Sequence, residues 1–162
     1  MSKKSSATKT AGKIFAAVTV ILLMIVFASS VYVGGMKRTA EKFCASFASG
    51  SYSDYEKVIL PVVDVHYDYT DNSFKENTRT AFENLPEFSE LGETDIISSK
   101  TKIKECRMDG SYDQWSCTAD VDYFCSGMSV SYKNVKIELN FSQGKWRVRY
   151  SDLPVFSEHL TD

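Results

Sequence analysis

Hydrophobic and polar positions divide the chain into one uninterrupted apolar run and a longer remainder with periodic patterns. The run covers residues 14–33 and contains no charged side chain. About 20 apolar residues in a helix span roughly 30 Å, which is the thickness of the hydrocarbon core of a bilayer. The pattern therefore predicts a transmembrane anchor over residues 13–35.

After the anchor, apolar residues recur with the period of an amphipathic helix. They are Ala40, Phe43, Cys44, Phe47 and Ala48. Gly34-Gly35 is predicted to separate this helix from the anchor, and Gly50 is predicted to end it.

Two further helices are predicted before the chain changes character. Ser51 or Ser53 can cap a short helix that runs through Ile59 and ends before Pro61. Another helix is predicted between residues 73 and 85, because Ser73 and the glutamate three residues later match a capping box.

The second half of the chain alternates apolar and polar residues, which is typical of half-buried strands. The predicted strands cover residues 96–108, 115–123, 130–141 and 146–150. Asp109-Gly110 is a hairpin signal, and the change of phase at Lys133-Asn134 predicts a bulge in the third strand. Helices followed by an antiparallel meander predict an α+β domain, with the helices packed on one face of a curved four-stranded sheet.

These elements resemble the nuclear transport factor 2-like, cystatin-like superfamily over residues 37–152. The resemblance rests on an opening helix of the form Phe43-x-x-x-Phe47-x-x-Gly50-x-Tyr52 and on a closing strand Gly144-Lys145-Trp146-Arg147-Val148. It implies a cone-like sheet and is strongest for small membrane-anchored bacterial domains. Because the superfamily contains enzymes, ligand binders and scaffolds, the resemblance implies no activity.

The charges that flank the apolar run predict its orientation. The basic residues ahead of it are Lys3, Lys4, Lys9 and Lys13, and the basic residues after it are Lys37, Arg38 and Lys42, partly offset by Glu41. This bias favours a cytoplasmic N-terminus. The predicted segments are a disordered cytoplasmic tail (1–12), the anchor (13–35), an extracytoplasmic domain (36–152) and a C-terminal tail (153–162). Ala28-Ser29-Ser30 permits an alternative, a signal peptide that is cleaved to give a secreted protein.

Composition limits the classes of partner that the domain is expected to bind. The formal net charge is −2, and the domain has no basic patch beyond the membrane flanks, which argues against nucleic-acid binding. The predicted partners are the lipid bilayer, through residues 13–35, and a protein or a second copy of the chain, through the domain. No cofactor is predicted.

Four cysteines, all beyond the anchor, predict two disulfides. Cys106 and Cys117 flank the predicted hairpin turn and are expected to pair, which leaves Cys44 to pair with Cys125. The alternative is that all four are free thiols. Their spacing lacks the paired ligands of a structural zinc site.

The densest polar cluster is Asp64, His66 and Asp68, which share one face if the segment is extended. Such a set suits a metal site or an acid–base pair, although a solvated loop has the same composition. Tyr52 and Tyr55 are candidates to line a small apolar pocket, or to fill the core. The leading hypothesis is a non-catalytic, membrane-anchored interaction or assembly module. The alternatives are a small-ligand binder and a lyase or isomerase that uses Asp64 or His66 as a base.

Overall fold

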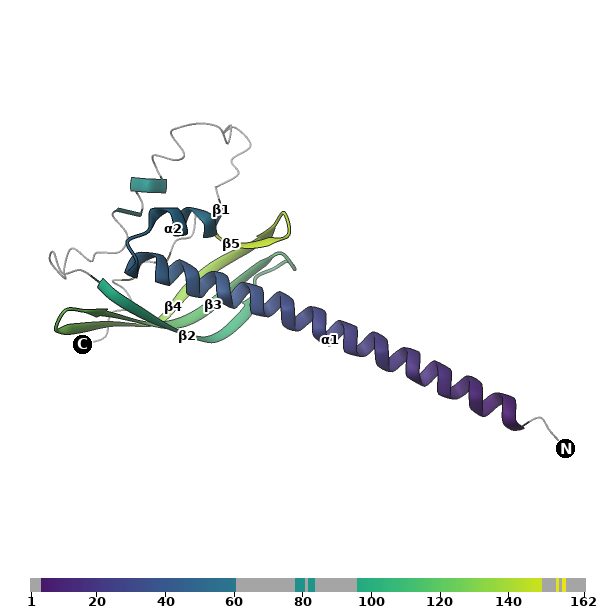
Figure 1. The fold of residues 1–162 in the computed structure, drawn as a ribbon. Coiled ribbons are helices and arrows are strands. Elements are labelled where there is room, and N and C mark those ends of the chain that lie inside the picture. Colours follow the sequence, from purple (N-terminus) through teal and green to yellow (C-terminus); the bar gives the residue numbers. More distant parts are fainter. Residues whose placement is uncertain are drawn as a thin grey trace, which may run out of the picture. The chain divides into compact units, whose positions relative to one another are not determined.

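The computed structural model describes residues 4–60, 78–80, 82–83, 96–149, 154 and 156. The chain divides into two compact units, Met1–Gly35 (the helical unit) and Met36–Asp162 (the sheet unit). The elements, shown in Figure 1, are α1 (Lys4–Ala48), α2 (Tyr52–Val58), β1 (Ile59–Leu60), β2 (Ile96–Met108), β3 (Gln114–Cys125), β4 (Met128–Ser142) and β5 (Lys145–Arg149).

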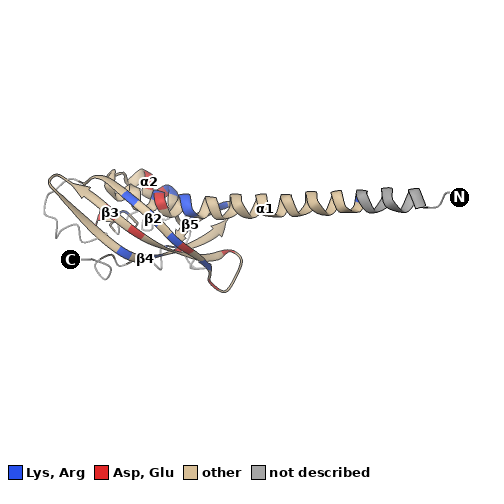
Figure 2. Ribbon diagram, turned by 90° about the horizontal axis from the view of Figure 1, so that it is seen from below, with Lys and Arg blue, Asp and Glu red and all other residues tan. Residues whose placement is uncertain are grey.

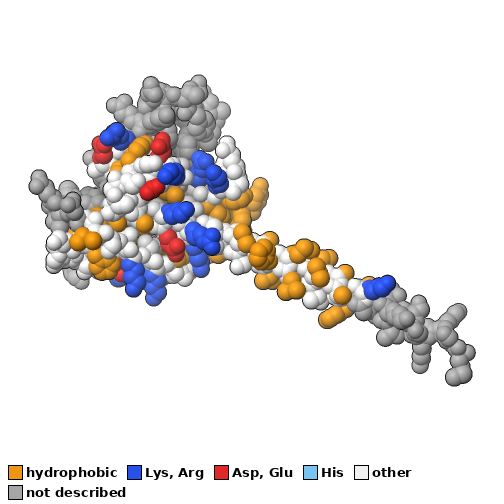
Figure 3. All heavy atoms as spheres, viewed as in Figure 1, with side chains coloured by type: hydrophobic (Ala, Val, Ile, Leu, Met, Phe, Trp, Pro, Cys, Tyr) orange, Lys and Arg blue, Asp and Glu red, His pale blue; other side chains and the backbone are white. Residues whose placement is uncertain are grey.

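The helical unit exposes apolar side chains along α1. The exposed large apolar side chains between Ile14 and Val31 have 48–75% of their surface accessible to solvent. Figure 3 shows hydrophobic side chains in orange along this part of the helix. The Thr19 and Ser29 hydroxyls donate to carbonyls one turn earlier, at 2.9 and 2.8 Å, so they are satisfied within the helix. This part of α1 is long and apolar enough to cross a membrane, although a signal sequence has the same properties.

The predicted break at Gly34-Gly35 is wrong, because α1 continues through both residues to Ala48. Glycine costs about 1 kcal/mol relative to alanine in a helix, but it keeps the backbone N–H and C=O that continue the helical hydrogen bonds. At its other end, α1 begins at Lys4, upstream of the predicted start of the anchor.

In the sheet unit, the five strands follow the order β1-β5-β4-β3-β2. The four predicted antiparallel strands are confirmed, and β2 has the predicted bounds. The sequence did not predict β1, which pairs in parallel with β5 through Ile59 and Val148. The predicted helix ends at Val58 instead of continuing through Ile59, because a β-branched residue and a residue before proline both disfavour helical backbone.

A bulge in β4 is confirmed where the apolar pattern changes phase. The register passes from Ala119↔Val135 to Val121↔Tyr132, so two residues of β4 oppose the one residue between Ala119 and Val121. One of the two, Asn134, has φ 59°, a left-handed conformation that asparagine tolerates better than most residues.

The last turns of α1 cover one face of the sheet (Figure 1). Phe43 and Cys44 are fully buried, and the hydroxyl of Tyr123 on β3 donates to the Cys44 carbonyl at 3.0 Å. Gly50, at φ 61°, follows the end of α1, and Ser51 caps α2 by accepting from the Asp54 amide at 3.3 Å. The predictions that Gly50 ends the first amphipathic helix and that Ser51 caps the next helix are therefore confirmed. Of the helix predicted between residues 73 and 85, residues 78–80 and 82–83 are helical and the others lie outside the described residues.

Candidate functional site

The predicted polar cluster, Asp64, His66 and Asp68, lies outside the residues that the structure describes. Its interpretation as a metal site or acid–base pair therefore stays a prediction. Within the described part of the chain, no group of three or more histidine, cysteine, aspartate or glutamate side chains is arranged to hold a metal ion.

Tyr52 and Tyr55 belong to an aromatic cluster between α2 and the end of α1. The Tyr55 ring is fully buried, with its centroid 5.0 Å from that of Phe82 and 5.7 Å from that of Phe47. Tyr52 is half-buried, 5.8 Å from Phe82, and burial raises the pKa of its phenol. Tilted and edge-on rings at these distances stabilise a packed core.

Cys106 and Cys117 oppose each other on the paired strands β2 and β3. Their Sγ atoms lie 3.0 Å apart, and all four cysteines of the chain are free thiols in the structure. Opposed residues of antiparallel strands have Cα atoms about 4.5–5.5 Å apart, within the range that a disulfide spans. The structure therefore brings the predicted pair together, and the covalent bond stays a prediction.

The predicted Cys44–Cys125 disulfide also stays a prediction. Both cysteines are buried, and both are free thiols in the structure. The backbone carbonyl of Cys44 accepts the Tyr123 hydroxyl at 3.0 Å, and Tyr123 lies two residues before Cys125 on β3.

Oxidation is expected to join Cys106 to Cys117 and to raise the free energy of unfolding by about 3 kcal/mol, because the bond closes a short loop in the unfolded chain. Oxidised glutathione supplies the oxidising equivalents, and the two thiols each lose a hydrogen. Intact mass and peptide mapping detect the bond, and chemical denaturation measures the gain.

Cys106→Ser should remove this gain under oxidising conditions, and the two proteins should differ little under reducing conditions. Cys125→Ser serves as the control and should keep the gain. Four alkylatable thiols after oxidation would contradict the prediction.

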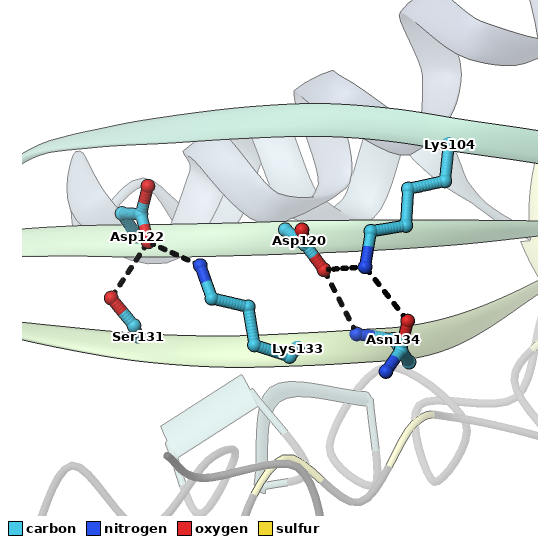
Figure 4. Close-up of polar contacts among 6 residues, drawn as sticks. All are labelled: Lys104, Asp120, Asp122, Ser131, Lys133 and Asn134. Atoms are coloured by element: carbon cyan, nitrogen blue, oxygen red, sulfur yellow. Dashed lines mark hydrogen bonds and ion pairs between the residues drawn. The ribbon is translucent and has the colours of Figure 1, made fainter. Parts of the chain in front are cut away.

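The best-defined polar arrangement lies on the sheet face away from α1 and is drawn in Figure 4. We call it the charged face. It consists of Lys104 on β2, Asp120 and Asp122 on β3, and Ser131, Lys133 and Asn134 on β4. Figure 2, in which the ribbon is coloured by residue type, shows that residues of both charge signs occur along these strands.

Asp120 is the centre of one half of the charged face. Its Oδ1 lies 2.7 Å from Lys104 Nζ and accepts the Asn134 backbone N–H at 3.1 Å. Lys104 Nζ also donates to the Asn134 side-chain oxygen at 2.8 Å. The β4 bulge creates this group, because it places two residues opposite Asp120 and turns one N–H towards the carboxylate.

Asp122 is the centre of the other half. Its Oδ1 accepts the Ser131 hydroxyl at 2.7 Å and lies 3.4 Å from Lys133 Nζ. Farther along the same face, Lys136 forms ion pairs with Glu138 and, at 3.6 Å, with Asp109.

These contacts favour the charged forms of Asp120, Asp122 and Lys136. The hydrogen bond from Lys104 lowers the pKa of Asp120, and the hydrogen bond from Ser131 lowers the pKa of Asp122. The contact with Glu138 raises the pKa of Lys136. All three groups are therefore charged near neutral pH, which suits electrostatic recognition rather than proton transfer at these positions.

Asp120→Asn is expected to destabilise the sheet unit by about 0.5–1 kcal/mol near pH 6, because it removes a partly exposed ion pair. The lowered pKa of Asp120 means that its contribution is complete above the ordinary value of 3.8 and is lost as the pH falls through the lower folded-state value. The difference between the two proteins in chemical denaturation should therefore shrink in acid. Asp54→Asn, which alters an exposed ion pair on α2, should have a smaller effect.

Asp120 and Asp122 occupy polar positions in the alternating pattern of β3, and this pattern alone indicates only that they lie on the solvated side of the strand. It did not identify Lys104 and Asn134 as partners of Asp120, because those contacts depend on the strand register. The only signal in the sequence was the change of phase at Lys133-Asn134.

Comparison of the chain with protein-family models and with curated proteins gave no match in either case. The resemblance to the nuclear transport factor 2-like superfamily therefore stays a prediction from the sequence.

Proposed function

We propose that the chain is a single-pass membrane protein whose residues 13–35 lie in the bilayer. The exposure of the apolar side chains along α1 carries this proposal. Exposed apolar surface costs about 25 cal/mol per Å² in water, and lipid removes that cost. The internally satisfied hydroxyls of Thr19 and Ser29 suit the same environment.

In this proposal the N-terminus is cytoplasmic and the sheet unit lies outside the cytoplasm. The lysines ahead of the apolar run support this orientation. The sheet unit is a cone-like domain of the nuclear transport factor 2-like type, which is supported by the order of its elements and by α1 covering one face of its sheet.

The sheet unit then serves as a non-catalytic interaction or assembly module. Support comes from the charged face, where lysines hold the carboxylates in their charged forms. Fixed charges of both signs give specificity and orientation to a protein contact. A general acid or base would instead need a pKa near the working pH.

A photo-crosslinking amino acid at Thr118 tests this function in intact cells that naturally carry the protein. Thr118 is half-buried and lies on the side of β3 that carries Asp120 and Asp122. We expect discrete crosslinked products whose yield falls at least fivefold when Lys133 and Lys136 are both replaced by glutamate.

Lys57→Glu is the matched control, because Lys57 also pairs with an aspartate, at 2.9 Å, but lies on α2. It should leave the yield unchanged. A yield that is zero, or that is insensitive to the charge reversals on β4, would contradict the proposed module.

A further inference from the structure

β2 is a long strand at the edge of the sheet. It has 13 residues, and β3 is the only strand that pairs with it among the described residues. Exposed sheet edges are commonly short because their unpaired N–H and C=O groups can pair with another chain. A long edge that no second described strand pairs with therefore needs an explanation.

The inner side of β2 is incompletely covered. Thr101, Ile103 and Cys106 are only half-buried. Their register partners on β3 are Val121, Ala119 and Cys117, and all three are fully buried. One more strand beside β2 would bury these three β2 side chains as fully as their partners on β3 are buried.

The outer side of β2 carries more basic than acidic side chains, and two of its lysines form no ion pair among the described residues. The strand contains four basic residues and one acidic residue. Lys104 pairs with Asp120, and Lys133 and Lys136 on β4 also have acidic partners. Lys100 and Lys102 are exposed and lie opposite Asp122 and Asp120 in the register, but neither comes within ion-pair distance of a carboxylate in the described part of the chain. Asp120 and Asp122 are paired instead with Lys104 and Lys133.

A second copy of β2 is a poor occupant of this edge. Antiparallel pairing centred on Lys102 would place Lys102 opposite itself and Lys100 opposite Lys104. Like charges directly opposite each other destabilise a strand pair. An acidic strand would have the opposite effect.

We propose that β2 binds an extended acidic segment of a partner protein by strand addition, with β-branched residues over Thr101 and Ile103 and carboxylates beside Lys100 and Lys102. The backbone supplies affinity and the alternating side chains supply specificity, as in other cases of strand addition. The inference rests on the proposed function, because it names the class of partner that the module binds.

A labelled peptide of alternating valine and glutamate, capped at both ends, tests the inference. Its binding to the full-length protein in neutral detergent is followed by fluorescence anisotropy. We expect saturable binding that weakens at least tenfold in the double variant Lys100→Glu and Lys102→Glu. The double variant Lys57→Glu and Lys145→Glu changes the net charge equally at exposed positions elsewhere and should bind normally.

Two N-methylated versions of the peptide test the backbone contact. In each, every second amide is methylated, and the two differ in which set is blocked. A bound strand points one set of amides at β2 and the other set away, so only one version should lose binding.

Equal loss in both N-methylated peptides, equal loss in the control variant, or no binding at millimolar peptide would overturn the inference. The last result would leave Lys100 and Lys102 as charges that only keep the edge from self-pairing. Peptide binding without crosslinked products at Thr118 would refute the proposed module in cells but not the binding edge. Crosslinked products without peptide binding would refute the binding edge but not the proposed module.

Discussion

Replacing Phe43 by alanine should lower the free energy of unfolding of the sheet unit by about 3–5 kcal/mol, the usual cost of removing a buried phenyl ring. Phe43 is fully buried where α1 covers the sheet. Its ring centroid lies 5.2 Å from that of Phe47 and 6.0 Å from that of Tyr55, so the change leaves a cavity between α1 and α2. Chemical denaturation of the full-length protein in detergent, followed by near-ultraviolet circular dichroism, measures the loss.

Phe124→Ala is the matched control for this prediction. It removes the same ring from β3, where Phe124 is 40% exposed and points to the side of the sheet away from α1. We expect a loss below about 1 kcal/mol, because little apolar surface leaves a buried site. Similar losses in the two variants would contradict the packing of α1 on the sheet.

The strands were predictable because their local pattern and their environment agree. In the middle of β3, the residues at every second position from Cys117 to Tyr123 are apolar and fully buried. The same reasoning found the β4 bulge, because a bulge shifts the phase of the alternation. A pattern of period two is preserved only where one face of a sheet is covered.

The errors occur where tertiary contacts decide the structure. β1 has two residues, and its existence depends on Val148 more than 80 positions later. Gly34 and Gly35 weaken a helix locally, yet α1 passes through them. The sequence pattern gives the identity of each element but not the long-range contact that extends or ends it.

The same limit applies to the candidate site. The sequence assigned chemistry to Asp64, His66 and Asp68, which are close together along the chain. The charged face instead combines Lys104, Asp120 and Asn134, which are close only because three strands pair in one register. Composition cannot distinguish a solvated aspartate from one that accepts two hydrogen bonds.

Replacing both Ile21 and Ile25 by arginine should release the full-length protein from the membrane. Each arginine costs about 3–4 kcal/mol relative to isoleucine near the centre of a transmembrane helix. The two residues lie one turn apart in α1 and are 52% and 56% exposed. Carbonate extraction of membranes should retain the wild-type protein and should lose most of the double variant.

The double variant Ile21→Leu and Ile25→Leu is the control and should stay in the membrane, because it keeps the apolar character of the helix. Protease treatment of intact cells should digest the sheet unit of the wild-type protein and spare the N-terminus, since the lysines before the apolar run favour the cytoplasm. A mature wild-type protein that begins near Val31 would show that the helix is a cleaved signal peptide. If residues 13–35 are instead an uncleaved anchor, the full-length wild-type protein should stay in the membrane fraction after carbonate extraction.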